Sequence, residues 1–397
     1  MNKLKFLIIF IIPIFLTGCY NYHELNDLAI TTALSIDYDR ETENFKVIAQ
    51  VINPVKEQDA KSSTETSFIN YTNEDKSLRE AIRTIILDSP KKLYGSQLQV
   101  IILSENVLYE RLPDIIDFFI REPELRAEFK VLIAKDNKAL EGITIQTLLD
   151  DLSSSNILDS LETQSEKIGI TTVVSLNELT NMYLNPYLEI VLPSMIIKGS
   201  IKEGTEKENL SSTIDETTIE ISTTGVFKDN KFLGYLTEEE SKTLNLIRGD
   251  IKNTIISMNI KDGFIVFEPN KIKTKTEANP KENTVKITID GLAKIKEITG
   301  LANLNSTDEI KKLEEEFNKL TENMIKTTFE NIREKYNTDV FKFRDLYYKT
   351  DYKYFKENQN NWYEDVFPNL KLEIKSEIKL YEKGNTLGGT KYERENQ

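Results

Sequence analysis

The sequence predicts an α+β protein of several domains, three in number, in which mixed β-sheets are flanked by helices. Three observations predict this class. Short runs rich in Ile, Val and Thr, such as residues 28–37 and 45–52, are typical of strands. Between such runs, apolar residues recur at helical spacing behind capping residues. After residue 251, several strand-like runs follow one another and precede a long helix.

The first part of the chain predicts a sheet with helices packed against it. Residues 28–37 and 45–52 predict a hairpin, and 64–72 a further strand. Ser77 and Glu80 form a capping-box pattern that begins a helix, which ends before Pro90.

The next segment predicts a strand, helices and another strand in that order. Residues 98–103 are mostly apolar and predict a central strand, which leads at 104–106 into a short helix. A helix over 113–121 and a strand over 129–134 follow. This order predicts a parallel pair of strands inside a mixed sheet.

Less regular elements are predicted up to residue 250. The expected elements are a helical stretch over 137–168 with a break at 153–155, a helix over 175–185, a strand over 187–198, an exposed loop over 199–213, a hairpin of 217–227 and 231–235, and a helix that Thr237 and Glu240 cap.

The last part predicts an antiparallel meander with a long packed helix. The strand-like runs are residues 254–260, 264–267, 272–278 and 284–298. Ser306 and Glu309 form a capping-box pattern at the start of a helix that reaches about residue 334, and a final strand covers 370–381. The predicted domains are 19–170, 171–250 and 251–397.

The four residues Leu16, Thr17, Gly18 and Cys19 form a lipobox behind a signal peptide. Residues 1–18 combine two lysines with the apolar run 6–15, which is too short for a permanent membrane span. The pattern predicts that residues 1–18 are removed and that the Cys19 thiol carries a diacylglyceryl lipid. Two acyl chains give stable anchoring. The alternative is an ordinary signal peptide with a chance cysteine, which would leave the only cysteine unpaired.

Composition argues against several classes of function. The formal net charge is −14, so phosphates repel the chain, and we expect no nucleic-acid partner. His23 is the only histidine, and a Ser-His-Asp triad or an ordinary zinc site needs histidine or cysteine that is missing. We therefore expect no enzyme, no metal and no cofactor other than the covalent lipid.

Several blocks of sequence carry a likeness to one family. They are the lipobox with the following residues 20–25, SQLQVIILSEN (96–106) with FFIREPELR (118–126), Gly225-Val226-Phe227 through GYLTEEES (234–241), and Asp339-Val340-Phe341 followed by Trp362 and the last strand. With these blocks the chain resembles the C-subunit lipoproteins of bacterial spore germinant receptors, the Ger(x)C family. Tyr20-Asn21 replaces the usual Trp-Asp, and residues 343–354 lack the expected glycines and Pro-x-x-Trp segment.

The resemblance implies a non-enzymatic subunit with three mixed α/β domains. It would be lipid-anchored at the outer face of the spore inner membrane. Its partners would be an A-type and a B-type integral membrane subunit, of which the B-type is the usual candidate for germinant binding.

Two charged groups are candidate partner contacts. The first comprises Arg121, Glu122, Glu124 and Arg126, and the second comprises Glu238, Glu239 and Glu240. For residues 121–126 the alternative is purely local structure, in which Pro123 starts a turn and the arginines pair with nearby carboxylates.

Two other functions remain open at this point. A substrate-binding lipoprotein of an importer is also anchored by a lipobox, but it alternates strand and helix through two lobes, unlike the meander expected here. A lipid-tethered wall-lytic enzyme is disfavoured by the scarcity of histidine.

Overall fold

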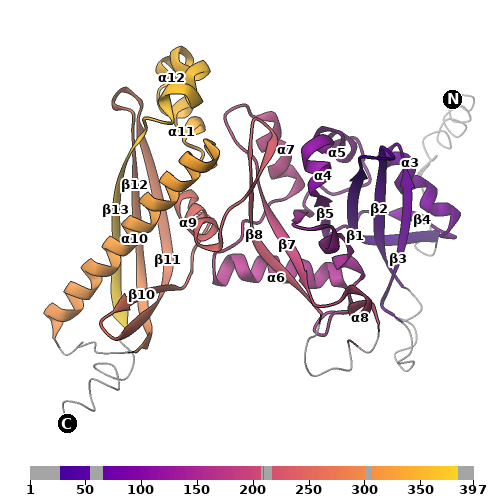
Figure 1. Cartoon of the computed structure of the whole chain (residues 1–397), viewed down its shortest axis with the longest axis horizontal. Coiled ribbons are helices and arrows are strands. Elements are labelled where there is room, and N and C mark those ends of the chain that lie inside the picture. The colour runs from indigo at the N-terminus through magenta and orange to yellow at the C-terminus, as the bar shows by residue number, and fades with distance from the viewer. Residues whose placement is uncertain (1–26, 54–65, 207–208, 210–216, 300–305, 383–397) are drawn as a thin grey trace, which may run out of the picture.

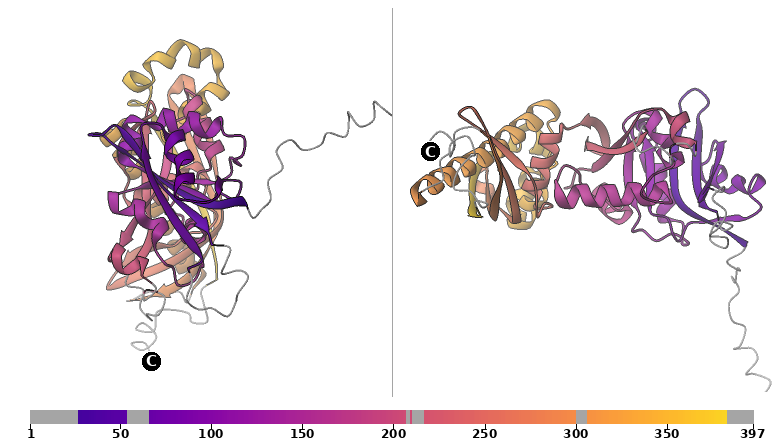
Figure 2. Two further views of the ribbon diagram at one scale, coloured as in Figure 1. Left: turned by 90° about the vertical axis from the view of Figure 1, so that its right-hand side faces the viewer. Right: turned by 90° about the horizontal axis from the view of Figure 1, so that it is seen from below.

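The computed structural model describes residues 27–53, 66–206, 209, 217–299 and 306–382. The predicted signal peptide, the lipobox with Cys19, the loop over 54–63 and the tail after residue 384 lie outside the described residues. Two β-sheets follow one another along the long axis of an elongated molecule (Figures 1 and 2).

The first sheet has nine strands in the order β3-β2-β1-β5-β6-β7-β8-β9, with β4 paired to β1. The strands are β1 (Leu28–Asp39), β2 (Asn44–Ile52), β3 (Phe68–Asp75), β4 (Lys92–Tyr94), β5 (Val100–Ser104), β6 (Lys130–Ala134), β7 (Val191–Lys198), β8 (Thr218–Lys228) and β9 (Lys231–Tyr235). All residues of β5 are buried, and β5 runs parallel to β1 and β6 on its two sides. The predicted central strand and parallel pair are therefore confirmed.

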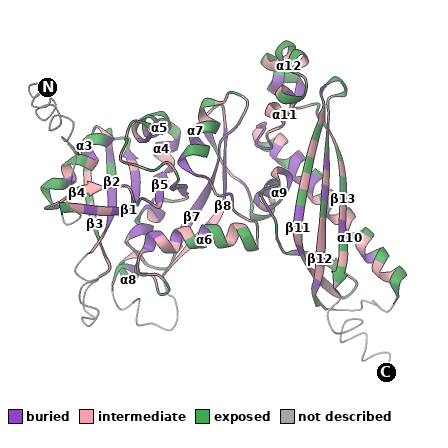
Figure 3. Ribbon diagram, turned by 180° about the vertical axis from the view of Figure 1, so that it is seen from behind, coloured by how far each residue is buried: buried purple, intermediate pink, exposed green. Residues whose placement is uncertain are grey.

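Helices cover both faces of this sheet. They are α3 (Leu78–Arg83), η3 (Thr84–Leu87), α4 (Glu105–Glu110), α5 (Leu112–Ile120), η4 (Asn137–Thr144), α6 (Ser153–Lys167), α7 (Leu176–Leu184), α8 (Ile201–Thr205) and α9 (Glu238–Arg248). Because side chains alternate along a strand, Ile101 and Leu103 pack with α4 and α5, while Val100 and Ile102 pack with η4 and α6. Figure 3 shows the resulting buried stripes between sheet and helices.

The prediction for residues 137–168 was partly wrong. The structure has a 3₁₀ segment at η4, and α6 begins where a break was expected. Ser153 is fully buried, and its hydroxyl donates to the Ile145 carbonyl at 2.5 Å. The Ser154 N–H donates to Gln50 Oε1 of β2. The first turn of α6 is therefore tied to strand β2 and the preceding loop through the Ser153 hydroxyl and the Ser154 N–H.

The second sheet consists of β10 (Ile256–Ile260), β11 (Gly263–Asn279), β12 (Thr284–Ile298) and β13 (Lys371–Glu382), in that order. The long helix α10 (Thr307–Tyr336) packs on one face and buries Leu313, Phe317 and Ile325. Ser306 and Glu309 form the predicted capping box at its start. The chain then continues through α11 (Phe343–Thr350), α12 (Tyr352–Asn358), the turn η7 (Gln359–Asn361) and the π-helical turn η8 (Trp362–Val366); η6 (Pro280–Glu282) joins β11 to β12.

The predicted antiparallel meander is present in β10, β11 and β12, and one detail of it was wrong. The runs 264–267 and 272–278 belong to one strand, β11, which has a bulge at Lys271 (φ 53°) and a second irregularity in its pairing with β12 at Val266 and Phe267. Gly291 on β12 lies opposite the bulge at Lys271. The last strand, β13, pairs parallel to β12, so the sheet is not wholly antiparallel.

The sheets show how the predicted domains relate to the fold. Strands β6 and β7 lie on either side of residue 170 and pair in the same sheet, whereas residue 250 lies between the two sheets. The mixed α+β class is confirmed, and the number of independently folding domains stays a prediction. Among the described residues, no helix combines the length and apolar composition that a membrane span requires.

Candidate interaction sites

The segment 121–126 forms one wall of a cavity of about 400 Å³ beside the first sheet. Leu34, Leu98 and Phe119 line its apolar interior. Four charged residues line the cavity as well: Arg79 of α3, Lys92 of β4, Glu122 and Glu124. The first predicted contact group therefore lies beside an apolar cavity on the part of the molecule nearest the N-terminus (Figure 1).

Two ion pairs hold this segment to the sheet. Arg79 Nη1 lies 3.0 Å from Glu122 Oε2, and Lys92 Nζ lies 2.7 Å from Glu124 Oε1. Leu125 packs against Gly95, where an added Cβ would lie only 2.2 Å from Leu125 Cδ2. Both glutamates of the segment are therefore paired with cations of α3 and β4, and contact with a partner stays a prediction.

The two arginines of the segment remain on the surface. Arg121 Nε lies 2.8 Å from Asp117 Oδ1, one helical turn earlier, and 71% of the Arg121 side chain is exposed. Arg126 is also exposed. These two side chains are more available to a partner than Glu122 and Glu124 are.

The second predicted group lies in the first turn of α9. Glu238 and Glu239 are exposed, and carboxylates at a helix N-terminus are stabilised by the helix dipole. Glu240 completes the predicted capping box with Thr237 and accepts a hydrogen bond from Asn331 of α10 at 3.4 Å. The two parts of the molecule are the N-terminal part, built on the first sheet and ending with α9, and the C-terminal part, built on the second sheet and α10. Glu240 of α9 thus joins these two parts. The structure does not bring the two groups together, because α5 lies over the first sheet and α9 lies between the two sheets (Figure 1).

A third site, which the sequence did not single out, lies where the two parts of the molecule meet. Glu189 precedes β7 and is 7% exposed. One carboxylate oxygen of Glu189 accepts from the hydroxyl of Tyr363, and the other accepts from the Asp229 N–H at 2.9 Å. One feature of the sequence could have identified Glu189. It is the only charged residue in the apolar run from Leu188 to Leu192, where a charge without a partner is costly.

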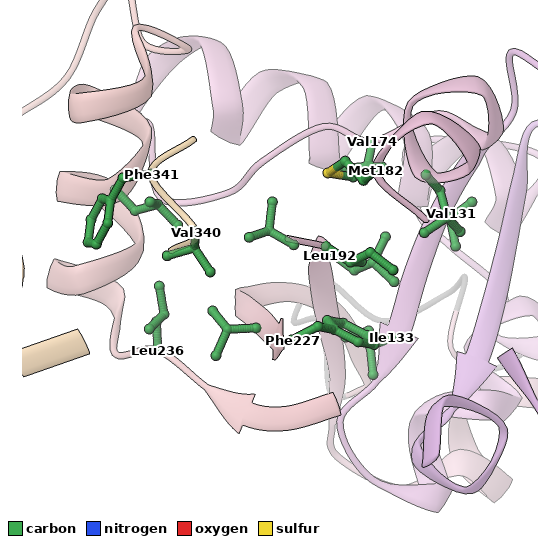
Figure 4. Packing of buried hydrophobic residues seen from close by; sticks show 14 of the residues in the cluster. Val131, Ile133, Val174, Met182, Leu192, Phe227, Leu236, Val340 and Phe341 are labelled. Atoms are coloured by element: carbon green, nitrogen blue, oxygen red, sulfur yellow. The ribbon is translucent and has the colours of Figure 1, made fainter. Parts of the chain in front are cut away.

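Asp339 explains part of the Asp339-Val340-Phe341 block. Its carboxylate accepts from the N–H groups of Phe343 at 3.1 Å and of Arg344 at 2.5 Å, so it caps α11. Val340 and Phe341 are buried and lie near Leu236, while Phe227 lies against Ile133 (Figure 4). Apolar packing is therefore continuous from the first sheet to the start of α11.

The buried carboxyls of Glu189 and Asp339 both have raised pKa values. Burial raises the pKa of Glu189 to about 7, and the hydrogen bond from Tyr363 opposes this shift. Burial also raises the pKa of Asp339 to about 6, against the effect of the N–H groups that it accepts from. The junction therefore contains two carboxyls that titrate closer to neutral pH than exposed carboxyls do.

Within the described residues, no group of three or more His, Cys, Asp or Glu side chains is arranged to hold a metal ion. Cys19 and the lipobox are outside the described residues, so lipidation at Cys19 stays a prediction.

Comparisons with known proteins match almost the whole chain. Residues 21–197 match the family described as "Spore germination protein N-terminal domain", and residues 222–384 match "Spore germination B3/ GerAC like, C-terminal". Spore germination protein KC of Bacillus subtilis is 23% identical over 383 residues, which cover 94% of this chain and 93% of that protein. Spore germination protein B3 of the same organism is 26% identical and covers 84% of this chain and 86% of its own.

A solved structure supports the fold. The chain described as the crystal structure of the GerBC protein superposes with a TM-score of 0.51 at 18% identity, over 87% of this chain and 96% of that one. No enzyme family is indicated, and the germinant-receptor C subunits are non-catalytic receptor components. The chain therefore belongs to the Ger(x)C family of spore germination proteins, as the resemblance of its sequence blocks predicted.

Proposed function

We propose that this chain is the lipid-anchored subunit of a nutrient germinant receptor. In this proposal a diacylglyceryl lipid on Cys19 holds it at the outer face of the spore inner membrane, where it assembles with A-type and B-type integral membrane subunits. The observation that carries the proposal is the match of both family domains over residues 21–384, directly behind the lipobox. The chain would stabilise or organise the receptor rather than catalyse a reaction.

Replacing Cys19 by alanine is expected to abolish lipid attachment and receptor assembly, because no other cysteine can carry the lipid. The measurement is mass spectrometry of the N-terminal peptide together with a pull-down from detergent-solubilised spore membranes. Wild type and the neighbouring control Asn21→Ala should carry the lipid and co-purify with two membrane proteins of A and B type.

Two results would contradict this proposal. One is a wild-type chain without lipid on Cys19. The other is a wild type that co-purifies with an ABC permease, which would favour the substrate-binding lipoprotein of an importer.

The exposed charges of both candidate contact groups provide a second test. We expect Arg126→Glu and Glu239→Lys to weaken co-purification of the membrane subunits about tenfold, because a reversed charge at an interface opposes complementarity. Lys312→Glu and Glu315→Lys on exposed positions of α10 are matched controls. Intact receptor and normal germination in both reversals would exclude these residues from the interface.

A further inference from the structure

A second cavity, also of about 400 Å³, lies at the junction of the two parts of the molecule. Its lining comes from five regions of the chain: α6, the segment 172–174 with α7, Leu188 before β7, the end of α9 with Asp250, and Lys342 before α11. None of the predicted contact residues lies in it. A volume of this size is within the usual range for small-molecule sites, about 300–1,000 Å³.

Arg248 brings a buried guanidinium to this cavity. Its side chain is only 5% exposed, and its Nε lies 3.1 Å from Asp250 Oδ2 without the alignment of a hydrogen bond. Nε and Nη1 are buried and have no hydrogen-bond acceptor among the described residues. Burial lowers the pKa of Arg248, while the charge of Asp250 opposes this effect. Buried donors of this kind are costly to leave unpaired.

Lys342 brings a second cation from the C-terminal part. Its backbone is in the left-handed region (φ 68°), and it immediately precedes α11. No carboxylate of the described residues lies within 4.0 Å of its Nζ. Its pKa is lowered, first by burial and then by repulsion from Arg248. An anion between the side chains of Arg248 and Lys342 would offset their mutual repulsion and favour the charged form of both.

The carboxylates around the cavity are already engaged. Glu178 Oε2 accepts from the N–H and the hydroxyl of Ser175, at 2.8 and 2.9 Å. Asp339 caps α11, and Asp345 pairs with Lys349 at 2.6 Å. Asp250 pairs with Arg248, its charge also acts on Lys342, and its side chain is 38% exposed. These anions leave the guanidinium and the ammonium with unused hydrogen-bond donors.

Part of the cavity lining is apolar. Val174 and Met182 are almost fully buried and line it together with Leu188 (Figure 4 shows the first two). We propose that this cavity binds a small organic carboxylate, whose carboxylate group lies between Arg248 and Lys342 and whose aliphatic part packs on Val174 and Met182. The residues that would bind the carboxylate come from both parts of the molecule. A bound carboxylate would therefore link the start of α11 to α7 and α9.

The test is ligand-detected NMR titration of the full chain in detergent, with butyrate as the probe. 1-Butanol controls for partition into the detergent, and chloride maintains the ionic strength. Butyrate should bind with a Kd of about 1 mM, and acetate about tenfold more weakly, because two buried CH₂ groups are lost. Arg248→Met and Lys342→Met should each weaken butyrate binding at least about tenfold. The exposed cations Arg126→Met and Lys335→Met are matched controls and should leave it unchanged.

Several outcomes would overturn the proposal. They are no butyrate binding at about 10 mM, equal binding of 1-butanol, equal binding of inorganic phosphate, and an unchanged Kd in Lys342→Met. If Arg248→Met does not fold, Lys342→Met still decides, since Lys342 is only partly buried. This test is independent of the receptor pull-down, so the two proposals can fail separately.

Discussion

Replacing Trp362 by alanine is expected to lower the free energy of unfolding of the C-terminal part by about 3–5 kcal/mol. Trp362 is 2% exposed and begins the π-helical turn η8. Its ring meets Tyr347 edge-on at 5.1 Å between centroids and stacks on Phe367 at 6.3 Å. The Tyr347 hydroxyl in turn donates to Asn283 at the start of β12. Truncation would leave a cavity between α11 and the second sheet.

The measurement is denaturant unfolding followed by circular dichroism, with hydrogen exchange of β11 to β13 to locate the effect. Trp362→Phe is the matched control, because it keeps an aromatic ring at the site; we expect it to cost roughly 1–2 kcal/mol. As the only tryptophan, Trp362 also reports unfolding of the wild type through its fluorescence. A loss of less than about 1 kcal/mol in the alanine variant would show that the site collapses without a cavity.

Elements whose signals are local in the chain could be predicted. Ser306 with Glu309 and Thr237 with Glu240 define helix starts within four residues, and both capping boxes are present. The apolar run at β5 predicted a central strand because only a strand buried on both faces tolerates it.

Features that depend on distant partners could not be predicted. The parallel pairing of β13 with β12 joins residues about 90 positions apart, and no local pattern encodes it. The bulge at Lys271 resembles a turn in the sequence, because the pairing of β11 with β12 on both sides of it is a non-local feature. Glu189 and Asp339 are 150 residues apart, and only folding brings the carboxylate of Glu189 and the backbone N–H of Asp339 to the hydroxyl of Tyr363. For the same reason Arg248 and Lys342 gave no sign of a shared cavity.

Glu189 is expected to make the protein less stable as pH rises from about 4.5 to about 7. Its pKa is about 7 in the folded protein and 4.5 as a model value, so in this range the folded state holds a proton that the unfolded state has lost. Stability then falls with increasing pH, and the fall ends above pH 7. At about 1.4 kcal/mol per pH unit, the loss is at most about 3 kcal/mol. Asp339 adds a smaller fall of the same sign between 3.8 and about 6.

Glu189→Gln should remove this fall and make its stability curve cross that of the wild type. At pH 5 the variant should be less stable by about 1 kcal/mol, because the amide that replaces the protonated carboxyl carries a second N–H, for which the hydrogen bonds of Glu189 provide no acceptor. At pH 8 it should be more stable, because no charge is buried. Tyr363→Phe should move the fall to higher pH, since it removes the donor that favours ionised Glu189. Thermal unfolding between pH 4.5 and 8 measures the stability of the wild type, Glu189→Gln and Tyr363→Phe. Parallel curves for wild type and Glu189→Gln would mean that Glu189 is already ionised at pH 5, and that a charged carboxylate holds the junction from pH 5 to pH 8.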